Sequence, residues 1–142
     1  MVQYLPPLGT EHWYESEIQV RNVVDLLDDE WVCFHHIRFL KPPREDYGGR
    51  NFGEIDFLLA HPVYGLFGIE AKGGRYHWDQ VSLQTIGGEE IKPDPIHQAQ
   101  MARSFFLDRS KRRPEIGFVP WNLFAAFPDM EPVRPFGPTG FE

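Results

Sequence analysis

Apolar residues recur along the chain with two different periods, and the change between them separates helices from strands. Val20, Val23, Val24 and Leu27 follow the spacing of one face of a helix. This spacing predicts a first helix over residues 11–29.

Short runs of β-branched and aromatic residues predict the strands. The first is Trp31–Phe39, followed by the apolar runs Ile55–Ala60 and Leu66–Ala71. Only five residues, one of them glycine, separate the last two runs, which suits a hairpin. Tyr76–Ile86 has room for one or two further short strands. Residues 1–10, which prolines and a glycine interrupt, are expected to be an irregular lead-in.

Asp94 and Pro95 open a second helix, because Asp is a good N-cap and proline fits the first helical position. The helix is expected to end in a basic cluster before Pro114. Phe118–Phe127 predicts a last strand, which Pro120 places at or near a sheet edge. The apolar side of the second helix would carry Pro95, Gln98, Ala99, Ala102, Phe105 and Phe106.

The order of these elements predicts an α/β fold with helices packed on the faces of a sheet. A chain of 142 residues favours a single domain. We assign residues 1–130 to that domain. Residues 131–142 are rich in proline and glycine and are interpreted as a tail or as a linker to a further module.

Two acids and a lysine are expected to meet on the predicted hairpin. If the hairpin is centred on Val63, Asp56 lies opposite Glu70, with their Cβ atoms about 4.5–5.5 Å apart. Lys72 lies on the same strand face as Glu70, because side chains alternate. Like charges opposed across a ladder are destabilising, so the pair must be solvated or neutralised by a cation.

Two further polar residues lie where the helices should be apolar. Glu17 extends the apolar stripe of the first helix, and Gln98 lies on the stripe of the second. Because both stripes must pack on the sheet, four or five polar groups from four elements would meet over the strand pair.

Metal-assisted phosphodiester hydrolysis is the chemistry that uses such a set. Mg²⁺ prefers oxygen ligands and keeps several waters, so Asp56 and Glu70, with the Ala71 carbonyl, would be enough to bind it. Lys72 would position or deprotonate the attacking water, or stabilise charge on the phosphate. Glu17 would complete the metal shell or hold a second ion, and Gln98 would orient a ligand, water or phosphate.

At these residues the sequence resembles the PD-(D/E)xK nuclease superfamily, and within it the nuclease-related domain called NERD. The resemblance implies a restriction-endonuclease-like core, a central mixed β-sheet flanked by helices in αβββαβ order. It also implies a nuclease dependent on Mg²⁺ or Mn²⁺ that acts on DNA, often fused to helicase, topoisomerase or kinase-like modules. Carried over by position, the active-site residues are Glu17, Asp56, Glu70, Lys72 and Gln98. The resemblance rests on Glu17 and on the segments WVCFHHIRF, GEIDFLLAHPVYGLFGIEAKGG, DPIHQAQ and VPWNLFAAFPDM.

Composition restricts the partners and the compartment. The net charge of −7 argues against a protein that only coats nucleic acid. We therefore expect a fused module or a homodimer to supply part of the affinity for DNA. With no signal-peptide pattern and no apolar run of membrane-spanning length, a cytoplasmic protein without membrane contact is expected. A single cysteine, Cys33, excludes a zinc site made of four cysteines.

Simpler interpretations remain open at each of these positions. Asp56, Glu70 and Lys72 would also suit a solvated sheet face with an ordinary ion pair. Glu17 would suit a helix end, and Gln98 a buried carbonyl that needs a donor. The rival functions are a catalytically inactive module that binds DNA or protein within a larger DNA-processing protein, and a purely structural interaction domain.

Overall fold

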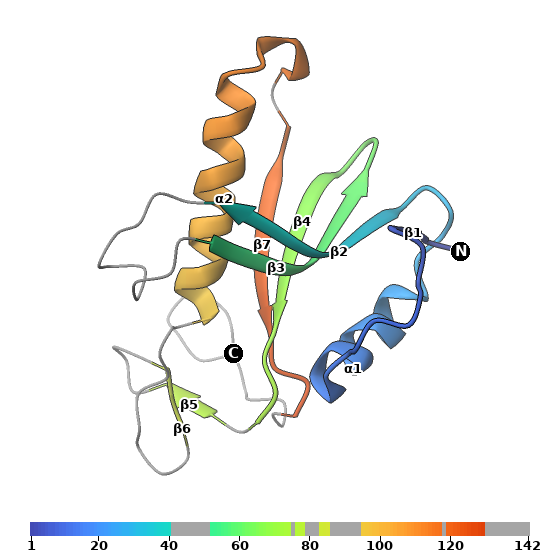
Figure 1. Ribbon diagram of the computed structural model, residues 1–142, viewed down its shortest axis with the longest axis vertical. Coiled ribbons are helices and arrows are strands. Elements are labelled where there is room, and N and C mark those ends of the chain that lie inside the picture. The colour runs from blue at the N-terminus through green and yellow to red at the C-terminus, as the bar shows by residue number, and fades with distance from the viewer. Residues whose placement is uncertain (41–51, 75, 79–82, 86–94, 118, 130–142) are drawn as a thin grey trace, which may run out of the picture.

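The computed structural model describes residues 1–40, 52–74, 76–78, 83–85, 95–117 and 119–129 (Figure 1). The predicted tail and the loop after residue 40 lie outside the described residues. The elements, in chain order, are β1 (Gln3–Leu5), α1 (Glu15–Val24), β2 (Val32–Leu40), β3 (Phe52–His61), β4 (Gly65–Ala71), β5 (Tyr76–Trp78), β6 (Leu83–Thr85), α2 (Pro95–Lys111), the 3₁₀ turn η2 (Pro114–Ile116) and β7 (Trp121–Ala126).

The main sheet has five strands in the order β1-β2-β3-β4-β7, and β5 pairs with β6 in a separate hairpin. β1 runs parallel to β2 and β7 runs parallel to β4, whereas β2-β3 and β3-β4 are antiparallel. The sheet is therefore mixed, and the predicted α/β class with a restriction-endonuclease-like core is confirmed. β7 forms one edge of this sheet, as Pro120 suggested.

The two helices pack on different sides of the strands, which lie between them in Figure 1. On one side, α1 buries Val20 and Val24 against Phe57 and Leu59 of β3. On the other side, the packing of α2 centres on Ala102. Because strand side chains alternate, one sheet serves two cores. Of the predicted α1 stripe, Val20 and Val24 are buried, whereas Val23 is 66% exposed.

The hairpin has the expected register. Ala60 pairs with Leu66 and Leu58 with Gly68, and the ladder continues to Phe57 and Ile69. It ends there, one pair short of Asp56 and Glu70. Asp56 comes just before Phe57 and Glu70 just after Ile69, so both acids lie immediately beyond the last pair of the hairpin ladder.

Two details of the N-terminal region differ from the expectation. Residues 3–5 form β1 instead of an irregular lead-in, and the Gln3 amide donates to the Trp31 carbonyl at 3.0 Å. α1 spans only Glu15–Val24, shorter at both ends than the predicted helix over 11–29. After Val24 the chain tightens, because the Leu27 amide donates to the carbonyl of Val24, three residues back.

β3 changes sides at its middle. In a regular strand Ile55 and Phe57 would face the same way, yet Phe57 packs in the α1 core and Ile55 in the α2 core. In Figure 1 the first half of β3 turns away from β4 toward α2. Asp56 lies at the turning point between the two halves.

In the part of the chain that the structure describes, no helix is both long enough and apolar enough to cross a bilayer.

The α2 core is closely packed at Gly68, and this closeness gives a test of the fold. A Cβ atom there would lie 2.6 Å from Ile55 Cδ1 and 2.8 Å from Leu123 Cδ2. Gly68→Ala is therefore expected to lower the free energy of unfolding by about 1–3 kcal/mol, measured by urea denaturation. Gly73→Ala is the matched control, because its nearest contacts would be at 3.4 Å. Equal stability of the two variants would contradict this packing.

Candidate active site at the open end of the hairpin

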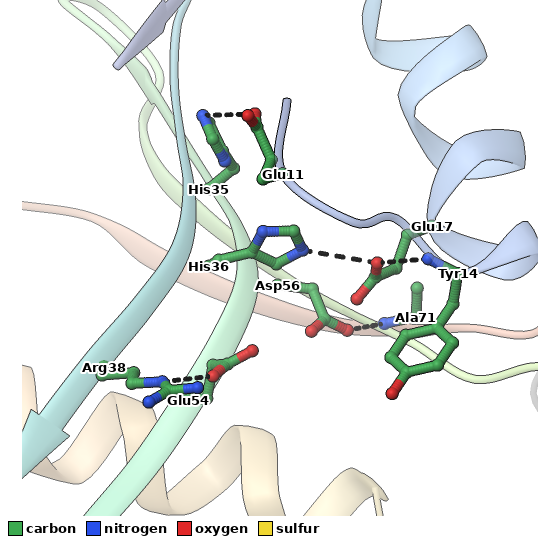
Figure 2. Close-up of polar contacts among 9 residues, drawn as sticks. All are labelled: Glu11, Tyr14, Glu17, His35, His36, Arg38, Glu54, Asp56 and Ala71. Carbon is green, nitrogen blue, oxygen red and sulfur yellow. Dashed lines mark hydrogen bonds and ion pairs between the residues drawn. The ribbon is translucent and has the colours of Figure 1, made fainter. Parts of the chain in front are cut away.

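At Asp56 the β3-β4 ladder has ended, and the β2-β3 ladder lacks one pair before it resumes at Ile55. Asp56 is 7% exposed, although its side chain is ionisable. The side chain replaces the missing ladder pair, because the Ala71 amide donates to Asp56 Oδ2 at 2.7 Å (Figure 2). The carboxylate is thereby held against the end of β4.

Glu70 and Lys72 belong to the same end of β4. Glu70 is half-buried and is the next residue after the last ladder pair. The Lys72 amide donates to the Ala126 carbonyl at 2.8 Å, so pairing with β7 fixes the backbone on which both side chains stand. Both Asp56 and Lys72 are close enough to Glu70 for their charges to act on its carboxyl group.

Burial and like charge act together on the two acids. Burial raises the pKa of Asp56 to about 6, although the hydrogen bond from the Ala71 amide opposes the rise. Burial also raises the pKa of Glu70 to about 8; the charge of Asp56 adds to the rise, and Lys72 opposes it. The charges of Glu17 and Glu54 add to the rise at Asp56. Each of the two acids would therefore bind a proton or a cation more readily than an exposed carboxylate.

Glu17 reaches the same place from the start of α1. It is 6% exposed, and its charge raises the pKa of both Asp56 and Glu70. One of its oxygens, Oε2, accepts from the Tyr14 amide at 2.9 Å and lies 3.3 Å from His36 Nε2 (Figure 2). Glu17 therefore closes the first turn of α1 and also forms an acidic cluster with Asp56 and Glu70.

Two neighbours of the cluster were not among the residues predicted for the site. The charge of Glu54 raises the pKa of both Asp56 and Glu70. Glu54 also forms an ion pair with Arg38 at 3.0 Å. Strand alternation was a signal for it, since Glu54 lies two residues before Asp56. His36 contacts Glu17 from β2, and no spacing in the sequence pointed to it.

Gln98 lies in the first turns of α2, but its side chain is outside the described residues. The basic run predicted at the end of the helix is present. Arg109, Lys111 and Arg113 line a hollow of about 750 Å³ whose walls include Leu66 and Trp121. Leu66 is near the other end of β4 from Glu70, so this hollow is separate from the acidic cluster.

The donor set matches a hard divalent cation held by few protein ligands. Among the described residues, no three His, Cys, Asp or Glu side chains are grouped so as to hold a metal ion by themselves. Mg²⁺ and Mn²⁺ do not need such a group, because one or two carboxylates with several waters are a common arrangement for Mg²⁺. Asp56 and Glu70 supply two hard oxygen ligands whose repulsion a cation would relieve. The residues present therefore fit a metal held by two carboxylates.

A comparison with protein families gives a match over most of the chain. The family described as the nuclease-related domain, NERD, matches residues 12–124, well over half of the 142 residues. The matched range contains the acidic cluster, Lys72 and Gln98. No curated protein and no solved structure matches the chain. With a mixed sheet, two flanking helices and this match, the chain belongs to the nuclease-related domain family.

Proposed function

We propose that this chain is a metal-dependent nuclease domain that hydrolyses phosphodiester bonds in DNA. The observation that carries the proposal is a pair of acids, the buried Asp56 and the half-buried Glu70, just beyond the last ladder pair of the hairpin and beside Lys72. Burial raises the pKa of both acids. A structural ion pair would have the opposite character, because an ordinary salt bridge lowers the pKa of its acid.

Each residue has a role that follows from its place. Asp56 and Glu70 would hold Mg²⁺ or Mn²⁺, and the Ala71 carbonyl belongs to the stretch of backbone that Asp56 contacts. Glu17 would complete the shell through a bound water or hold a second ion, using the oxygen that does not accept from the Tyr14 amide. When bound, the metal would supply an acidified water and neutralise charge on the phosphate.

Lys72 would act on the phosphate or on the water. In hydrolysis, a water gives up a proton as its oxygen bonds to phosphorus, the bond to the leaving deoxyribose oxygen breaks, and that oxygen takes up a proton. An ammonium group beside Glu70 can stabilise the charge that develops on the phosphate oxygens. We propose that Gln98 orients a ligand or the phosphate from α2.

The wider assignments follow from this proposal. We propose that the domain extends over residues 1–130 and works in the cytoplasm. A fused helicase, topoisomerase or kinase-like module, or a second copy of the chain, would supply DNA affinity that a net charge of −7 disfavours.

Metal binding tests the two-carboxylate site directly. The wild-type chain is expected to bind Mn²⁺ in calorimetric titration at pH 7.5. Asp56→Asn and Glu70→Gln should each weaken binding at least about tenfold, since each removes a charged ligand. Binding should also strengthen between pH 6 and pH 8, because the ligands must be deprotonated. Asp108→Asn, an exposed acid on α2, is the control; if it lost as much affinity as the two site variants, the assignment would be wrong.

The raised pKa values also predict an unusual dependence of stability on pH. The unfolded chain releases the protons of these two acids near pH 4, whereas the folded metal-free chain keeps them up to about pH 6 at Asp56 and about pH 8 at Glu70. The contribution of this pair to the free energy of unfolding is thus present at low pH and is lost as pH rises through the folded pKa values. In EDTA, Glu70→Gln should be more stable than wild type at pH 8 by on the order of 1–3 kcal/mol, and by less at pH 5. Urea denaturation at both pH values measures this difference.

Glu115→Gln, which changes an exposed acid in η2, is the control for that measurement. It should keep the wild-type dependence on pH. A Glu70→Gln protein with that same dependence would show that the acids do not share a buried environment.

Cleavage of supercoiled plasmid tests the activity itself. With Mg²⁺ or Mn²⁺ present, Lys72→Ala is expected to lower the rate at least about 100-fold, and EDTA should abolish cleavage. Lys111→Ala, an exposed lysine at the end of α2, should cleave at the wild-type rate. DNA binding without cleavage by the wild-type chain would overturn the nuclease proposal and favour an inactive binding module.

A further inference from the structure

His36 has a backbone conformation that is unusual for its residue type and position. Its φ angle is +49°, in the left-handed region, although it lies inside the strand β2. Within the described residues it is the only residue other than glycine with a positive φ. Such a conformation is disfavoured in a residue with a Cβ atom and persists only where the surroundings impose it.

The conformation interrupts the sheet opposite Asp56. His35 pairs with Phe57 and Ile37 pairs with Ile55, whereas the pair between them, His36 and Asp56, is missing from the ladder. The same step is where the strand pair passes from the α1 core to the α2 core. The left-handed residue therefore coincides with the bend that brings Asp56 to the Ala71 amide.

The side chain of His36 contacts the acidic cluster as well. Its Nε2 lies 3.3 Å from Glu17 Oε2, and its ring packs on Trp13 with 4.5 Å between ring centroids. Figure 2 shows the imidazole on the β2 side of Glu17, with Asp56 next to both. A single residue thus touches Glu17 with its side chain and has its left-handed backbone at the missing ladder pair opposite Asp56.

We infer that His36 is a positioning residue for the carboxylate site, with two separable parts. Its left-handed backbone sets the bend at Asp56, and its imidazole holds Glu17 beside that acid. The inference rests on the proposed function in so far as the positioned acids bind a metal. It assigns His36 no contact with the metal or the substrate.

Three substitutions separate the two parts. His36→Gly permits the left-handed backbone but removes the ring. His36→Asn tolerates that backbone and keeps a donor for Glu17, and His36→Ala has neither advantage. The control is His61→Ala in the same strand pair, since His61 Nδ1 accepts from the amides of Val63 and Tyr64 at the far end of the hairpin.

The measurements are melting temperature and Mn²⁺ affinity by calorimetry, both on the 142-residue chain. His36→Gly should melt within a few degrees of wild type or above it, yet bind Mn²⁺ about 10- to 100-fold more weakly. His36→Asn should recover most of that affinity, and His36→Ala should lose both stability and affinity. His61→Ala should melt several degrees lower and keep the wild-type affinity.

A His36→Gly protein with wild-type Mn²⁺ affinity would overturn the inference, as would affinities that simply follow melting temperature across the set.

If the wild-type chain binds no Mn²⁺, the proposed function fails, and a double-mutant cycle in melting temperature then decides the positioning role. Non-additive effects of His36→Gly and Glu17→Gln would support the contact between them. Additive effects would refute it.

Discussion

Burial of two acids, Asp56 and Glu70, and the repulsion between them dominate the energetics of this site. Asp56 and Glu70 follow the last ladder pair of the β3-β4 hairpin, where burial and like charge both favour their neutral forms. A fold gains no stability from such a pair at neutral pH. The arrangement is explained if a cation is the missing partner of the two carboxylates.

Most of the architecture brings side chains to this one point. α1 delivers Glu17 from its first turn, and the parallel β4-β7 pairing fixes the backbone that carries Glu70 and Lys72. β3 bends at Asp56 to pass from one core to the other. The Asp56 carboxylate therefore accepts from the Ala71 amide at the end of β4, where no ladder pair forms. The two cores supply the stability, and the bend between them supplies the geometry.

The sequence allowed the elements and the hairpin to be predicted because these depend on local signals. A five-residue connection and two apolar runs determined the register, and the register determined which acids come together. β1 was missed because prolines cut its run to three residues, too short to show an alternating pattern. The bend was missed because a left-handed histidine has no compositional signature, unlike a glycine in a turn. The predicted register is therefore correct, but Asp56 and Glu70 are not a ladder pair. The ladder ends at Phe57 and Ile69, and the Asp56 side chain accepts a hydrogen bond from the Ala71 amide instead.

Whether Asp56 and Glu70 share one cation can be measured in crystals grown with Mn²⁺, where anomalous scattering locates the bound ion. One peak is expected within coordination distance of carboxylate oxygens of both Asp56 and Glu70, at about 2.0–2.3 Å. A peak that touches only one of them, or no peak at the open end of the hairpin in crystals that bind Mn²⁺ elsewhere, would contradict it.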